Sequence, residues 1–161
     1  MSLRKRPWNR VDMPVYSISS KRDDEANMNI ITYVTPVSMQ PKRILCCIYK
    51  GTKTLEIVET KPAFVLQLLH SEQHGLVRLL GKQSGFDTDK LRLLRRRELL
   101  TEWQGFPVLK DALAWVHLRG INRFDGGDHI GFICDVVAYH NRQEGEPLTL
   151  NRLRALRIIS A

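Results

Sequence analysis

The sequence is poor in the residues that mark several structural classes. Its 161 residues include 3 cysteines, 7 prolines and 10 glycines, too few for a disulfide-stapled, collagen-like or Pro/Gly-rich disordered chain. No apolar run approaches the roughly 18 residues of a membrane-spanning helix, so we expect no membrane partner. The basic N-terminus is not followed by an apolar segment, so we expect no secretory signal and a reducing, cytoplasmic setting. A chain of this length is expected to form one domain with its own core.

The motifs of several enzyme classes are also missing. There is no GxSxG, HExxH, GxxxxGK[ST] or GxGxxG pattern, which argues against a serine nucleophile elbow, a zincin site, a P-loop and a Rossmann nucleotide site. Cys46, Cys47 and Cys134 lack zinc-site spacing and lie in apolar runs, as buried thiols do. His70 and His74 could share a helix face as metal ligands, but no third ligand is spaced with them, so we predict no metal site.

The charge is strongly unbalanced. Lysine and arginine number 25 against 17 aspartates and glutamates, a formal charge of +8, which suits either a polyanion or one small anionic ligand. Arg92, Arg95, Arg96 and Arg97 lie within about two turns of an expected helix. No aromatic residues interleave with them to stack bases, so we interpret this helix face as solvated and do not expect nucleic acid as a partner.

The order of the expected elements favours a mainly β fold. Two helices are expected between residues 71 and 99, and a short one after a cap at Thr54. The tail, 147–159, fits either a strand or a helix. Residue types and alternation predict strands at 14–19, 28–37, 43–49, 63–69, 115–119 and 130–139. This order does not fit βαβ alternation, so we expect a closed antiparallel barrel with inserted helices. Residues 1–13 form an N-terminal arm and residues 14–161 the barrel domain.

The segment from Asn27 to Thr54 carries the most informative chemistry. Two strand ends are expected beside a loop that contains Lys50, Lys53 and the hydroxyl of Thr52, directly before a helix N-terminus. Cations, hydroxyl donors and the free amides of a first helical turn together suit a phosphate. An ordinary hairpin followed by a capped helix explains the same residues, and the residues alone leave both interpretations open.

Several spaced motifs resemble those of the flavin reductase-like family of FMN-binding split barrels. The stretch Val37-Ser38-Met39-Gln40-Pro41 is similar to the family's VSxxP turn, Cys47-Ile48-Tyr49-Lys50 to its CxNK strand, and Thr54 to the threonine that follows. Further along, 106–115 resembles PVLxDALAW, 127–136 resembles GDHxxFxGxV, and 147–148 resembles the closing PL. The resemblance covers about residues 14–150 in the expected order. Tyr49 departs from the pattern, because it stands where many members have asparagine.

The resemblance implies a homodimer of six-stranded antiparallel Greek-key split barrels, each with a few inserted α-helices and one FMN near the subunit interface. It also implies a reductase that takes a hydride from NADH or NADPH and passes it to flavin or to an acceptor protein; the alternative is a non-catalytic or electron-carrier flavoprotein. His129 matches the histidine beside the nicotinamide side of the flavin, so it is the expected catalytic residue. The expected cofactor-binding residues are Asn29, Ile30, Thr32, Tyr33, Ser38, Cys47, Ile48, Lys50, Thr52 and Thr54.

Overall fold

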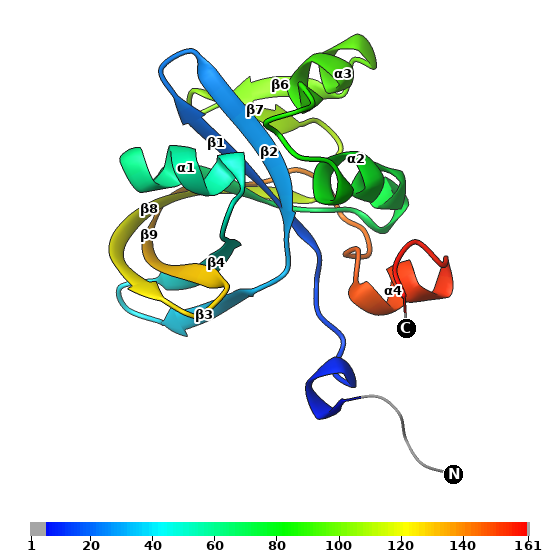
Figure 1. Ribbon diagram of the computed structural model, residues 1–161, viewed down its shortest axis with the longest axis horizontal. Helices are drawn as coiled ribbons and strands as arrows, with labels where there is room; N and C mark the ends of the chain where they lie inside the picture. The colour runs from blue at the N-terminus through cyan, green and yellow to red at the C-terminus, as the bar shows by residue number, and fades with distance from the viewer. Residues whose placement is uncertain (1–5, 161) are drawn as a thin grey trace.

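The computed structural model describes residues 6–160, which form one curved sheet with helices packed against it (Figure 1). The strands are β1 (Tyr16–Arg22), β2 (Glu25–Ile31), β3 (Val34–Ser38), β4 (Arg43–Tyr49), β5 (Ala63–Leu68), β6 (Leu100–Trp103), β7 (Phe106–Leu109), β8 (Ala114–Asp125) and β9 (His129–Asn141). The helices are α1 (Lys53–Thr60), α2 (Val77–Lys82), α3 (Lys90–Arg96) and α4 (Leu150–Ala155), with 3-10 segments η1 (Pro7–Asn9) and η2 (Ser71–Leu76).

The main sheet has seven strands in the order β2-β1-β5-β8-β9-β4-β3, and every neighbouring pair is antiparallel. The mainly β prediction, antiparallel with a few helices, is confirmed. The expectation of six strands in a closed barrel is wrong, because the sheet has seven and, within residues 6–160, no ladder joins its edge strands β2 and β3. These edges are consecutive in the chain, and only Thr32 and Tyr33 connect them. We call this two-residue connection the seam.

The sheet is strongly bent where β8 and β9 pair. The register between them shifts at His117/Leu118 and again at Gly120/Asn122, and such irregularities bend the strands that carry them. β8 passes close to Pro62 here: the Gly120 amide donates to the Pro62 carbonyl at 2.7 Å, and a Cβ on Gly120 would lie only 3.2 Å from that proline's Cβ, which favours glycine. The bend makes β8 and β9 sweep around beneath α1 (Figure 1).

The bent sheet separates two apolar clusters. The first lies inside the curve and is covered by α1, with members from β1, β4, β5, β8 and β9 such as Ile18, Phe64 and Phe132. The second packs α2, α3, α4 and the β6–β7 hairpin against the other side of the sheet. Between them, β1 is buried on both faces, so its serines need partners. Ser19 Oγ donates to the Pro107 carbonyl at 2.6 Å, which ties the hairpin to the sheet.

The tail is helical, and it holds the N-terminal arm against the sheet. The Leu150 amide donates to the Met13 carbonyl at 2.9 Å, and the Asn151 amide donates to Asp12 Oδ1 at 2.9 Å. Of the expected arm, residues 1–5 lie outside the described residues. Among the helices of residues 6–160, none has the length and apolar character required to cross a bilayer.

Candidate functional site

A cavity of about 370 Å³ opens beside the seam, between β2, β4, the start of β9 and the segment that follows α2. Its volume falls within the range of about 300–1,000 Å³ that is typical of small-molecule sites. The walls include residues that the sequence analysis predicted to bind the cofactor. They also include residues 80–85, which were not predicted. The predicted site residues that line the cavity are Asn29, Ile30, Thr32, Tyr33, Cys47, Ile48, Thr52 and His129.

Three predicted site residues do not line this cavity. Ser38 ends β3 and pairs with Arg43 at the turn into β4. The Nζ of Lys50 lies 3.0 Å from an Asp125 carboxylate oxygen. Thr54 is fully buried, and its hydroxyl accepts a hydrogen bond from the side chain of Asn27 at 3.0 Å.

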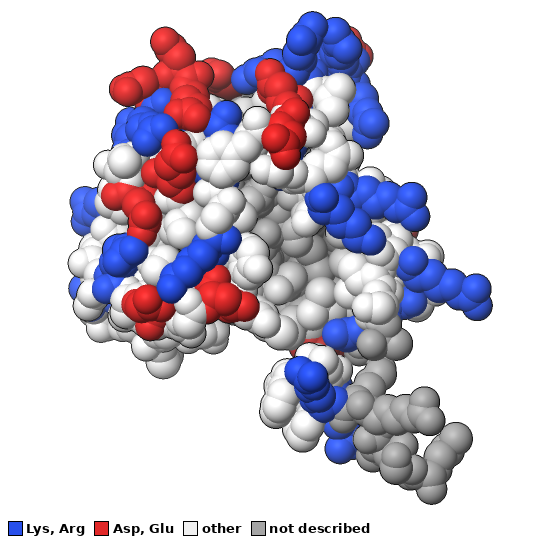
Figure 2. Space-filling view, in the orientation of Figure 1, with Lys and Arg blue, Asp and Glu red and all other residues white. Residues whose placement is uncertain are grey.

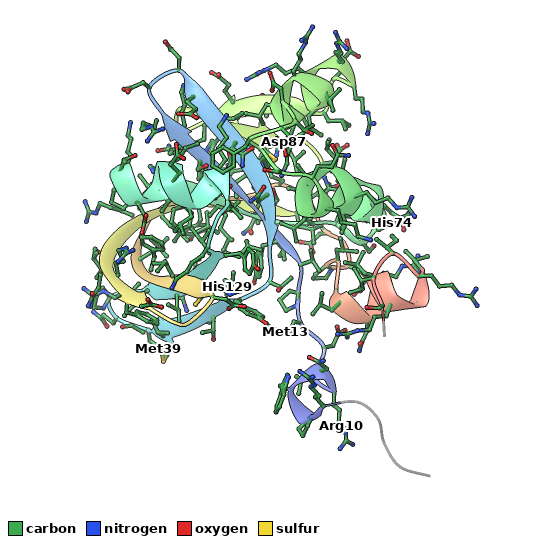
Figure 3. All side chains as sticks on the ribbon, viewed as in Figure 1. Arg10, Met13, Met39, His74, Asp87 and His129 are labelled. Atoms are coloured by element: carbon green, nitrogen blue, oxygen red, sulfur yellow. The ribbon has the colours of Figure 1, made fainter. Side chains whose placement is uncertain are left out.

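Three aromatic side chains stand together in the wall of the cavity. The His129 ring lies 4.7 Å from the Tyr33 ring and 5.2 Å from the Tyr49 ring, measured between centroids. Tyr49 and His129 are register partners on β4 and β9, which explains their proximity. Both tyrosine side chains are more than half exposed, so the aromatic group forms the mouth of the cavity. Figure 3 shows His129 on the side of the sheet that faces β2.

The orientation of His129 is fixed by the preceding residue. Its Nδ1 lies 2.6 Å from Asp128 Oδ1, and an ionised carboxylate can only accept, so Nδ1 carries the proton of this bond. The β8–β9 turn is itself held by ionic contacts. The Gly127 amide and the Lys50 ammonium keep the pKa of Asp125 below its ordinary value. His129 therefore presents its Nε2 edge from a rigid turn.

A buried polar network lies behind the wall of the site and reaches the first cavity at Asn29. Lys90 is 2% exposed, and its Nζ donates to Asn29 Oδ1 at 2.5 Å and to the Leu80 carbonyl at 3.0 Å. The side-chain Nδ2 of Asn27 donates to the Thr54 hydroxyl at 3.0 Å and to Asn29 Oδ1 at 3.4 Å. Gly85 lies directly against the Asn27 amide, and a Cβ there would overlap it. Glycine is therefore required at this close approach.

Lys90 carries the only charge in this network, and within residues 6–160 no carboxylate forms an ion pair with it. Burial lowers its pKa to about 8, because a charged ammonium is destabilised away from water. A second cavity, of about 700 Å³, lies on its other side, and Gly85 lines both cavities. Sequence reasoning missed Lys90. The available signal was its spacing of four residues from Leu94, which places it on the buried face of α3.

The first turn of α1 adds donors to the same region. The Thr52 hydroxyl accepts from the Leu55 amide at 3.2 Å, so Thr52, rather than the expected Thr54, caps the helix. The amides of Lys53 and Thr54 have no acceptor in the part of the chain that the structure describes, as is usual in a first turn. Thr52 lines the first cavity and Lys53 the second. The helix start thus adds positive potential near the boundary between the cavities.

The cysteines and histidines that the sequence raised as candidates occupy other kinds of position. Cys46 and Cys134 are fully buried, whereas Cys47 is partly exposed and lines the cavity. A hydrogen bond with Cys134 and burial raise the pKa of Cys46, and burial raises that of Cys47. His70 caps η2, because its Nδ1 accepts from the Glu72 amide at 3.1 Å. None of residues 6–160 form a cluster of three or more metal-ligating side chains.

The fold is therefore a bent antiparallel sheet with a cavity at its seam; aromatic side chains form the mouth of this cavity, and a buried lysine lies behind its wall. The model of the flavin reductase like domain matches residues 8–159, so the chain belongs to the flavin reductase-like family, and the resemblance of its motifs is confirmed.

One relative in sequence and two solved structures are similar to this chain. The chain is 29% identical over 137 residues to the high molecular weight rubredoxin of Moorella thermoacetica, an alignment that covers 84% of this chain and 58% of that protein. The chain therefore spans little more than half of that relative. Two solved structures share the fold. Flavin reductase PheA2 in its native state has a TM-score of 0.74 at 24% identity, over 88% of this chain and 87% of its own. The FMN-binding protein of Thermus thermophilus with bound 1-cyclohex-2-enone has a TM-score of 0.76 at 21% identity, over 91% and 84%.

Proposed function

We propose that the protein binds FMN in the cavity beside the seam and transfers a hydride from NADH or NADPH to flavin or to an acceptor protein. The observation that carries this proposal is Lys90, a buried cation without a carboxylate partner among residues 6–160. A buried charge needs compensation. Lys90 lines the second cavity, which meets the first at Gly85, and we assign the phosphate of FMN to this boundary. Family membership and relatives named as a flavin reductase and an FMN-binding protein support the same ligand.

The donor set fits both ends of a flavin mononucleotide. Lys90 and the free amides of Lys53 and Thr54 at the start of α1 are donors of the type that binds phosphate, whereas the Thr52 hydroxyl already donates to the Tyr49 carbonyl at 2.9 Å. Ile30 and Ile48 supply apolar wall, and Thr32 with the backbone of the seam supplies hydrogen-bonding groups for the ring edge. When bound, FMN supplies the hydride and electron chemistry, so the protein needs no nucleophile or acid/base dyad of its own. We assign His129 to the reacting side, where Asp128 holds its orientation.

A second candidate is an electron-carrier flavoprotein that another protein reduces. The observation that favours it is the pair of tyrosines beside His129. Tyr49 and Tyr33 both project at the cavity mouth, where they narrow the approach of a nicotinamide ring to the bound flavin. In both candidates the flavin occupies the same site. The two differ in whether NADH or NADPH reduces the bound flavin directly.

We also propose that two copies associate as a homodimer. Apolar side chains on β3, β8 and β9 remain exposed in the single chain, among them Val37, Phe124, Val137 and Tyr139. Three of these four lie on the paired strands β8 and β9, and exposed apolar side chains of this size are typical of protein contacts. Sedimentation equilibrium measures the state directly, and a monomer at all concentrations would refute the dimer.

The function is tested by spectroscopy on the purified protein. We expect a yellow preparation, or a colourless one that takes up added FMN with a shifted visible spectrum. A colourless protein that fails to take up FMN would refute the proposal. Anaerobic addition of NADH and NADPH separates the two candidates, because direct bleaching indicates a reductase and an unchanged oxidised spectrum indicates a carrier. Lys90→Met should lose FMN affinity, while Lys110→Met, at an exposed lysine, serves as the control.

A further inference from the structure

The ion pairs of this protein are concentrated on one side of the molecule. The basic partners lie on β1, β4, β8, α1 and the loop before α1. The carboxylates lie on β2, α1, β8 and β9. The lysines and arginines that take part are Arg22, Arg43, Lys50, Lys53, Arg119 and Arg123. On this side the two signs of charge compensate each other locally.

The helices α2, α3 and α4 show the opposite arrangement. Besides the buried Lys90 on α3, nine basic side chains lie on or just after these helices; eight of the nine are exposed, and none forms an ion pair within residues 6–160. They are Arg78, Lys82, Arg92, Arg95, Arg96, Arg97, Arg152, Arg154 and Arg157. We call these nine residues the basic face. In Figure 2, blue side chains gather along the side of the molecule that carries α3, α2 and α4, with some red beside α3, whereas blue and red alternate on the opposite side.

Helix dipoles account for only part of this pattern. Five of the nine lie in the last turns of their helices, where a cation is stabilised by about 0.3–1 kcal/mol; they are Lys82, Arg95, Arg96, Arg152 and Arg154. That effect does not explain why none of the nine is paired, since carboxylates do lie nearby: Asp89 caps α3 and Glu98 follows Arg97, yet within residues 6–160 neither forms an ion pair with the basic face. Surfaces that only need to stay solvated usually mix both signs, because like charges repel. An uncompensated set of this size is instead typical of a surface that receives an anionic partner.

The basic face reaches the mouth of the proposed flavin site. Lys82 lines the cavity, and Arg154 lines an adjoining hollow together with Thr32 and Tyr33 of the seam. The Nζ of Lys82 also donates to the Ile158 carbonyl at 2.6 Å, which joins the end of α2 to the segment after α4. A partner seated on these two helices would therefore cover the rim of the cavity.

We propose that the basic face docks an acidic electron-transfer protein over the cavity mouth. The proposal rests on the flavin function above, because it takes the partner to be the protein that exchanges electrons with the flavin. Complementary charge accelerates and orients such encounters. Nucleic acid fits less well, because Phe86 is the only aromatic residue in the segments 77–97 and 150–157, and single strands need several stacking side chains.

The test uses a purified rubredoxin of net negative charge as the probe and measures its binding to the FMN-supplemented protein by titration calorimetry at low and high salt. Arg78→Glu/Arg152→Glu reverses two charges of the basic face. Lys42→Glu/Lys61→Glu makes the same change in net charge at exposed lysines on other parts of the surface. We expect the first pair to weaken binding by about tenfold or more at low salt, with the control pair within about twofold of the parent and a flatter salt dependence in the first pair.

Three outcomes would overturn the proposal. Equal losses in both double variants would show that only the net charge matters. Tighter binding of duplex DNA, or of vesicles of anionic phospholipid, than of rubredoxin would assign the face to another partner. Absence of rubredoxin binding at low salt would leave the face without an acidic protein partner. FMN titration of the same samples is a separate readout, so failure of flavin binding is distinguished from failure of docking.

Discussion

Lys90 should make flavin binding depend on pH in a specific direction. In the ligand-free protein its pKa is about 8 because it is buried. A phosphate bound beside it favours the charged ammonium, which raises the pKa again. Above pH 8 the free protein has lost this proton, and FMN binding must take it up. The affinity for FMN should therefore fall as the pH rises above about 8, by up to about tenfold per pH unit.

The change in FMN affinity is limited by how far the pKa of Lys90 rises when FMN binds. A full return from about 8 to the ordinary 10.5 is 2.5 pKa units, which at about 1.36 kcal/mol per unit is about 3.4 kcal/mol, or about 300-fold in affinity. This is the upper limit for one lysine. The same shift acts on the ligand-free protein, because the unfolded chain keeps its proton up to about 10.5. Its free energy of unfolding should therefore rise with pH between about 8 and 10.5.

The assay is fluorescence titration of FMN at a series of pH values from about 7 to 9.5, with riboflavin, which has no phosphate, as the matched ligand. The parent protein should show the falling affinity with FMN and a flat profile with riboflavin. Lys90→Met should bind FMN more weakly at pH 7 by about 1.5–3 kcal/mol and lose the pH dependence. An FMN profile that is flat in the parent, or equally steep in the variant, would refute the role of Lys90.

Three further predictions address the site and the core. Lys50→Ala should leave the FMN dissociation constant within about twofold by the same titration, because this lysine pairs with Asp125 outside the cavity lining; a loss of tenfold would place the phosphate at that loop. Of the three thiols, Cys47 alone should react with a thiol reagent in the native protein, more slowly when FMN is present, as mass spectrometry of the labelled protein would show. Gln67→Leu should lower the free energy of unfolding in urea by about 2–3 kcal/mol, because the fully buried Gln67 accepts from the Leu109 amide at 2.6 Å; Gln143→Leu, at an exposed position, should change it little.

Local sequence patterns predicted some elements well and failed where distant contacts decide. The strand expected at 43–49 is β4 with the same bounds, because its apolar run is bounded on both sides by turn residues. The single run expected at 28–37 is two strands, since β-favouring residues continue through the seam without interruption. The β6–β7 hairpin was missed because Leu99 continues the leucine spacing of α3. The chain leaves the helix at Glu98, which adopts a left-handed backbone (φ 56°).

In the candidate site, too, the features that depend on distant contacts were the ones that the sequence did not predict. The residues on β2 and β4 that the family resemblance named, Asn29, Ile30, Cys47 and Ile48, were found in the cavity wall. Lys50 was not, because its partner Asp125 is 75 residues away in the chain. Thr54 was expected to cap α1, but the helix begins at Lys53, so its side chain faces inward. Lys90 was missed because its spacing from Leu94 marks only a face of α3, and it is the packing of that face against the sheet that buries the lysine.

Because the sheet is open at the seam, a bound ligand should stabilise the contact between the two ends of the sheet. The sheet runs from one edge to the other without a closing ladder, and the Cys47 amide holds the Tyr33 carbonyl at 2.9 Å where the edges meet. A ligand in the cavity would contact β2 on one side and β4 on the other. It would therefore link two strands that no ladder joins within residues 6–160. Hydrogen exchange of amides on both strands should therefore slow together when the ligand binds. A circular permutant opened between Thr32 and Tyr33 would keep every ladder yet depend on the ligand to hold its edges together.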